Sequence, residues 1–123
     1  MTLIRKKIEI LGTKGKKEIN VLFDSGSSRS LIREDIAREI SKMIEYPRPD
    51  KFRAINETII EAKKSTPLAF DLNGCSLAHD FKVIDNLDEE AVIGADLMQL
   101  KKIKIDMEKE YIDTSQCEIY NRL

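Results

Sequence analysis

The pattern of hydrophobic and polar residues along the chain predicts a protein built mainly from short β-strands. Residues 4–11 alternate partly between apolar and polar side chains, and residues 19–23 form a second, mostly apolar segment. Alternation is typical of a strand with one face in the core, and short apolar runs are typical of buried strands. Gly12 and Gly15 lie between the two segments, so we expect a β-hairpin here.

A helical periodicity replaces this pattern between residues 33 and 44. The apolar residues of this segment would share one face of a helix: Ile36, Ile40, Met43 and Ile44. Two acidic residues, Glu34 and Asp35, come at its start, where the helix dipole favours negative charge. Pro47 and Pro49 follow, and because proline lacks a backbone N–H we expect the helix to end before them.

The rest of the chain is predicted to form further strands separated by turn residues. We expect strands at residues 30–32, 61–72, 81–84 and 91–93, a hairpin over residues 52–60 with its tip at Asn56 and Glu57, and a final hairpin over residues 103–107 and 111–113. Asn73 and Gly74 form a strong turn signal because both residues tolerate positive φ. Asp96 is expected to cap a short helix, with Gln99 three residues further on.

The length of 123 residues indicates a single domain. The pattern described above predicts that this domain is mainly β, with one medium and one short helix. The 21 basic and 22 acidic residues leave a net charge of -1, so charge gives no reason to expect nucleic acid as a partner. No apolar run approaches the roughly 20 residues that cross a bilayer, and residues 1–7 lack the apolar stretch of a signal peptide. We therefore expect no membrane association and a cytoplasmic protein.

The histidine and cysteine content excludes several kinds of catalytic site. Cys75 and Cys117 have no metal-ligand spacing, and without export signals we expect both to be reduced thiols. One histidine, His79, is too few for a zinc site or a histidine-based triad, so we expect it at the surface or at a strand edge. No metal and no other cofactor is expected, and any chemistry must rest on carboxylates, hydroxyls or the backbone.

Asp24 is the strongest candidate for that chemistry. It follows the apolar strand at residues 19–23, where an acidic side chain is costly unless neighbouring groups bond to it. Ser25 and Ser27 can supply hydroxyls, and Gly26 lets backbone N–H groups approach the carboxylate. Asp, Ser and Gly are also favoured turn formers, so these residues alone are compatible with a simple strand-to-turn connection.

Together with a second segment, this motif resembles the retropepsin-like (retroviral-type) aspartic proteases. Residues 24–26, Asp-Ser-Gly after an apolar strand, resemble the active-site motif of this family. Residues 92–98, Val-Ile-Gly-Ala-Asp-Leu-Met, resemble its apolar-apolar-Gly segment and following short helix, in which Gly94 and Asp96 would be structural residues. The resemblance spans residues 8–112 and implies a closed acid-protease β-barrel that is one half of a two-fold dimer.

The resemblance also implies a mechanism for an aspartic endopeptidase that hydrolyses peptide or protein substrates. Two facing carboxylates share one proton, so that the charged one activates a water and the protonated one polarises the scissile carbonyl. The chain has one such motif, so the second carboxylate must be Asp24 of another copy, in an isologous homodimer. Ser25 would brace the two loops across the axis, and a Ser27 hydroxyl donating to Asp24 would lower the pKa of the pair.

The substrate cleft is less well defined by the sequence. The residues expected near it are Leu22, Ile55, Asn56, Ile59 and Val92, some of them on a flap over residues 52–60. The flap tip lacks the glycines usual in retropepsins, and the helix predicted at residues 33–44 is longer than theirs. Two alternatives stay open: a retropepsin-like dimerisation or peptide-binding module with little or no proteolytic activity, and an unrelated small β-barrel binding module.

Overall fold

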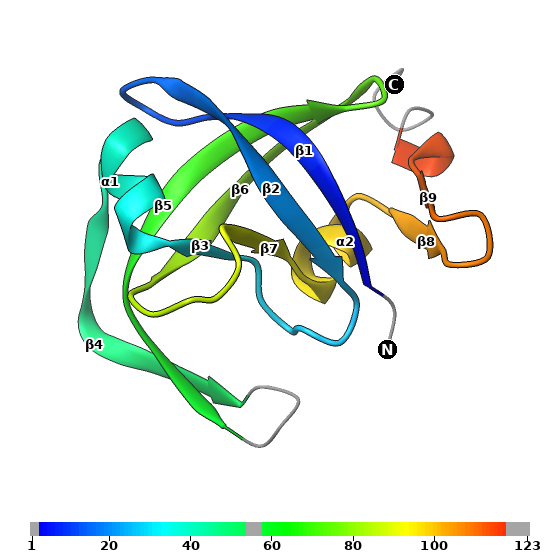
Figure 1. Ribbon diagram of the computed structural model, residues 1–123. Coiled ribbons are helices and arrows are strands. Elements are labelled where there is room, and N and C mark those ends of the chain that lie inside the picture. Colours follow the sequence, from blue (N-terminus) through cyan, green and yellow to red (C-terminus); the bar gives the residue numbers. More distant parts are fainter. Residues whose placement is uncertain (1–2, 54–57, 118–123) are drawn as a thin grey trace.

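The computed structural model describes residues 3–53 and 58–117, and most of them lie in one strongly curved sheet (Figure 1). The strands of this sheet are β1 (Leu3–Leu11), β2 (Lys16–Asp24), β3 (Leu31–Arg33), β4 (Ile44–Arg53), β5 (Ile59–Leu72), β6 (Cys75–Ile84) and β7 (Ala91–Ile93). The labelled helices are α1 (Glu34–Ile40) and α2 (Ala95–Leu100), and residues 115–117 are also helical. A separate two-stranded sheet contains β8 (Lys104–Asp106) and β9 (Tyr111–Asp113). No helix in these parts of the chain has the length and apolar character needed to cross a membrane.

Six of these strands close into a barrel. Their order is β1-β2-β7-β3-β6-β5, and the pairing of Leu11 with Ala69 joins β1 back to β5. The remaining strand of the sheet, β4, pairs with β5, and the two extend together beyond the barrel (Figure 1). The predicted class, a mainly β protein with a closed barrel, is therefore confirmed.

The barrel encloses the hydrophobic core, and strand periodicity explains which residues enter it. In β2, Ile19, Val21 and Phe23 are buried, because alternate side chains of a strand point to the same face. All three residues of β7 are buried, as expected for a short apolar strand with neighbours on both sides. The predicted hairpin turn between β5 and β6 is also present, with φ of 50° at Asn73 and 85° at Gly74.

The predicted helix at residues 33–44 is wrong in its length. α1 ends at Ile40, and Ser41 adopts an extended conformation. The next amide, Lys42 N–H, donates to the Thr13 side-chain oxygen at 2.7 Å, so the chain is tied to the β1–β2 turn instead of continuing the helix. Met43 packs against the core from a non-helical segment, which is why its helical spacing was misleading. α1 and α2 are therefore both short.

Pro47 and Pro49 were expected to follow the end of the helix, and they lie within β4. The ladder between β4 and β5 is interrupted between Glu45 and Asp50, so neither proline is required to donate a ladder hydrogen bond. The strand therefore accommodates both prolines and continues to Arg53. The pairing of Phe52 with Ile60 confirms the predicted hairpin here, whereas its predicted tip at residues 56–57 lies outside the described residues.

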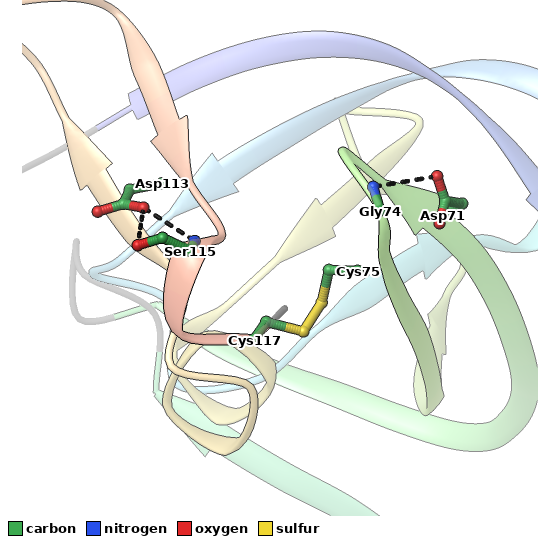
Figure 2. Close-up of a disulfide and its surroundings, with 6 residues drawn as sticks. All are labelled: Asp71, Gly74, Cys75, Asp113, Ser115 and Cys117. Carbon is green, nitrogen blue, oxygen red and sulfur yellow. Dashed lines mark hydrogen bonds between the residues drawn. A yellow bond between two sulfur atoms is a disulfide. The ribbon is translucent and has the colours of Figure 1, made fainter. Parts of the chain in front are cut away.

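The two cysteines do not form the reduced thiols that we expected. Cys75 and Cys117 form a disulfide with a Cα–Cα distance of 5.8 Å, and both residues are buried (Figure 2). The bond joins the β5–β6 hairpin to the segment after β9, where the Asp113 carboxylate accepts hydrogen bonds from the N–H and hydroxyl of Ser115. The partners are 42 positions apart, so no local motif could indicate the pairing.

Reduction of this disulfide is expected to lower the free energy of unfolding by about 2–4 kcal/mol, because the bond restricts the unfolded chain over a long loop. Urea titrations with and without a reducing agent would measure the difference. A Cys117→Ser variant is the control. Its free energy of unfolding should equal that of the reduced protein and should not change when the reductant is added. Equal stability of the oxidised and reduced forms would contradict this prediction.

Candidate active site

The barrel topology brings the two predicted motifs together at one edge of the sheet. β2 and β7 run parallel with Phe23 opposite Ile93, so Asp24, the last residue of β2, and Gly94, the residue after β7, lie at the same edge of the sheet. β7 also pairs with β3, so the loop at residues 25–30 that connects β2 to β3 crosses the end of β7 (Figure 1). This crossing places the loop after Asp24 against the start of α2.

The Asp24 side chain is held by the backbone of its own loop. Gly26 N–H donates to the Oδ1 atom of Asp24 at 2.9 Å, and Ser27 N–H donates to the Asp24 backbone carbonyl at 3.1 Å. Glycine at position 26 thus supplies the backbone donor that the sequence predicted. The two bonds close a tight turn and fix the direction of a partly exposed carboxylate.

The two serines of the loop have different surroundings. The Ser27 hydroxyl donates to the Arg29 carbonyl at 2.7 Å, so our expectation that it donates to Asp24 is wrong. Its contribution is to shape the loop. Ser25 is exposed and borders a groove whose other walls come mainly from α2 and β8.

Gly94 is the point at which the loop touches the rest of the barrel. A Cβ atom at this position would lie 2.5 Å from the Arg29 carbonyl oxygen and 2.6 Å from that of Ser27, closer than any side chain tolerates. The next amide, Ala95 N–H, donates to the Ser27 carbonyl at 2.7 Å. Only glycine therefore allows the loop and α2 to approach this closely, which agrees with the structural role predicted for it.

Asp96 is not the helix cap that we predicted, because Gly94 occupies the N-cap position and Asp96 lies in the first turn of α2. Its carboxylate accepts hydrogen bonds from Ser30 N–H at 3.1 Å, from the Ser30 hydroxyl at 2.7 Å and from Leu97 N–H at 2.7 Å. The Ser30 hydroxyl in turn accepts Gly94 N–H at 3.0 Å. Asp96 therefore ties the end of the loop to α2.

His79, which we expected at the surface or at a strand edge, lies in β6 and joins this network as a half-buried residue. Its Nε2 atom lies 3.0 Å from Oδ2 of Asp96, and each of the two side chains is only 21% exposed. Burial by itself would raise the pKa of Asp96, but the hydrogen bonds from Ser30, His79 and Leu97 outweigh it and lower the pKa below its ordinary value.

A groove of about 580 Å³ lies between Asp24 and the β4–β5 hairpin. Leu22 and Val92 line it, as the sequence predicted, and belong to a small buried apolar cluster beneath it. Ile59 is 62% exposed and does not line the groove, whereas its neighbour Ile60 does, because successive strand residues face opposite sides. Ile55 and Asn56 lie outside the described residues.

Several groove residues were missed by the sequence reasoning. They are apolar side chains from β3, β4, β5, β6 and the loop after β6: Leu31, Phe52, Ile60, Ile84 and Leu87. The alternation of β5 could have indicated Ile60 in place of Ile59, but the others are brought together only by the closure of the barrel. Within the described residues, no group of three or more His, Cys, Asp or Glu side chains is placed to hold a metal ion.

Comparisons with known proteins agree with this geometry. A family model described as Ty3 transposon peptidase matches residues 2–119. The retroviral protease-like domain of Ddi1 from Leishmania major is 17% identical, with a TM-score of 0.55 over 95% of this chain and 88% of that one. EIAV protease, solved with the inhibitor HBY-793, is 19% identical, with a TM-score of 0.59 over 83% of this chain and 92% of that one. No curated protein matches the chain. The structural likeness confirms a retropepsin-like fold.

Gly94→Ala is expected to destabilise the protein by about 1–3 kcal/mol, because the added methyl group would collide with two backbone carbonyls. Gly15→Ala is a matched control, since a Cβ at that position meets nothing within 4 Å. Urea unfolding of both variants would test the contact. Equal effects of the two substitutions would show that the approach at Gly94 is not tight.

Asp96→Asn is expected to lower the free energy of unfolding at neutral pH by about 1–3 kcal/mol, because a hydrogen-bonded carboxylate is replaced. The pKa of Asp96 is lowered by folding, so its stabilisation is present above its unfolded pKa and is lost as the pH falls through its folded pKa. The gap between wild type and variant should therefore narrow below about pH 4. A gap that stays constant from pH 7 to pH 2 would contradict the assignment.

Proposed function

This chain belongs to the Ty3 transposon peptidase family, and from that premise we propose that it is an aspartic endopeptidase that acts as a homodimer. The observation that carries the proposal is the position of Asp24. A backbone-anchored carboxylate lies at the edge of an apolar groove, on a loop that Gly94 and Asp96 hold in place.

The proposed reaction uses the carboxylates of two Asp24 residues, one from each subunit. When they face each other within a few Å, both cannot be ionised, so they share one proton. The ionised group takes a proton from a water that attacks the scissile carbonyl, and the protonated group polarises that carbonyl and then protonates the leaving amine. The reaction needs no metal and no other cofactor.

We infer that the second copy approaches the side of the loop that carries Ser25. Ser25 is exposed there, beside the groove formed with α2 and β8. An approach from this side would set the two Asp24 loops against each other and leave the apolar grooves on either side of them for the substrate. The two-fold arrangement makes the contact isologous, with Ser25 of each copy at its centre.

The groove supports an extended peptide or protein segment as substrate. Its floor carries apolar side chains, including Leu22 and Val92, which suit apolar substrate residues. The β4–β5 hairpin stands over the groove and contributes Phe52 and Ile60, so it would act as the flap that covers a bound peptide. With apolar subsites on both sides of the two carboxylates, we expect cleavage of peptide bonds between apolar substrate residues.

The proposal is tested by comparing wild type with Asp24→Asn on a mixed peptide pool from acid to neutral pH. We expect cleavage by wild type with a bell-shaped pH dependence, and a loss of at least about a thousandfold in the variant, because its dimer carries two amides at this position and neither can serve as general base. Thermal unfolding of both proteins controls for folding. Equal cleavage by both, or none by either, would favour a peptide-binding or dimerisation module.

Sedimentation analysis would test the dimer separately. A two-fold dimer is expected at the concentrations at which cleavage is seen, and Ser25→Arg is expected to weaken it, because it places a bulky charge at the proposed axis. Asp88→Asn is a control, since Asp88 lines the substrate groove away from Ser25. A strictly monomeric protein that still cleaves peptides would rule out the paired mechanism.

A further inference from the structure

We infer that His79 is a positioning residue for the active-site loop, acting through Asp96. The inference rests on the proposed function, because the loop that it would hold carries Asp24. The proposal is that the imidazole N–H fixes the Asp96 carboxylate, and that this carboxylate fixes Ser30 and, through it, Gly94.

The first argument is the number of donors around Asp96. A carboxylate offers about four acceptor positions. Ser30 donates twice and Leu97 once, which leaves one position for His79 at 3.0 Å. Because Asp96 is only 21% exposed, removal of the imidazole would leave a largely shielded carboxylate oxygen with one donor fewer.

The second argument is that His79 is itself held in place. It lies in β6, and its ring meets the ring of Phe81 edge-on, with centroids 6.1 Å apart and an interplanar angle of 79°. Phe81 is 1% exposed and belongs to the core. The imidazole is therefore held by packing against the barrel core, and its contact with Asp96 fixes that carboxylate relative to β6.

The third argument is that β6 already holds the same loop through its backbone. Lys82 N–H donates to the Ser30 carbonyl at 3.0 Å. The contact between His79 and Asp96 adds a second tie between β6 and Ser30, from the side-chain direction. Ser30 is then fixed at its carbonyl, its N–H and its hydroxyl, and its hydroxyl accepts the N–H of Gly94.

The chemistry of the contact specifies the protonation of the ring. An ionised carboxylate accepts and does not donate, so Nε2 of His79 must carry a proton, whether the ring is neutral or charged. The neutral ring should therefore be the Nε2–H tautomer. Glutamine can present an amide N–H at about the same reach, whereas leucine keeps the apolar volume beside Phe81 and has no donor.

The test compares His79→Gln with His79→Leu in the full chain. Hydrogen exchange of the Gly94 and Ala95 amides measures how well their hydrogen bonds to the loop are maintained. Peptide cleavage assays give kcat and KM. For His79→Leu we expect about tenfold faster exchange of these amides and about a tenfold lower kcat with little change in KM. For His79→Gln we expect both values within about threefold of wild type.

The inference is overturned if the two variants behave alike, whether both match wild type or both are impaired to the same degree. The exchange measurement needs no proteolysis, so an inactive wild type would refute the proposed function and leave His79 testable. If His79→Leu does not fold, the tautomer of the wild-type His79 ring, measured by nitrogen-15 NMR, tests the inference instead. A neutral Nδ1–H tautomer would exclude donation to Asp96, and the Nε2–H tautomer or the imidazolium would support it.

Discussion

The structure depends on one close backbone contact, where the loop at residues 25–30 crosses the end of β7. Gly94 is the residue that permits it, since a side chain there would collide with the carbonyls of Ser27 and Arg29. The contact follows from the barrel topology: β7 lies between β2 and β3, so the chain joining those two strands has to pass over it. Asp24 begins that passage, and its direction is therefore determined by strands that are far apart in the sequence.

Local features of the fold could be read from the sequence, and features that join distant segments could not. The hairpin turn at Asn73 and Gly74 and the burial of β7 depend on a few adjacent residues, and both predictions are confirmed. The disulfide between Cys75 and Cys117 depends on how the segment after β9 returns to the barrel. The early end of α1 is of the same kind, because Thr13 from a distant turn competes for the Lys42 amide.

The site shows the same division. Gly26 bonds to Asp24 two residues away, and the sequence predicted this backbone donor. The Ser27 hydroxyl was assigned to the wrong acceptor, because a hydroxyl can turn to either neighbour and the loop conformation selects the Arg29 carbonyl. Asp96 is acidic and close to a helix start, which is the signature of a cap. Its use as the acceptor for Ser30 and His79 requires three segments to meet, and no spacing within one segment could indicate that.

The proposed dimer places a particular requirement on each subunit. If two copies of Asp24 are to share a proton, each loop must hold its carboxylate in position against the repulsion of the other. Repulsion between like charges would push a flexible loop away from the axis, so rigidity has to be present within each subunit before the two meet. The hydrogen bonds from Gly26 to Asp24 and from Ser30 to Asp96 both lie within one chain, at the start and the end of the loop. Because both ends are tied inside the subunit, the proposed dimer contact would only have to align two loops that are already formed.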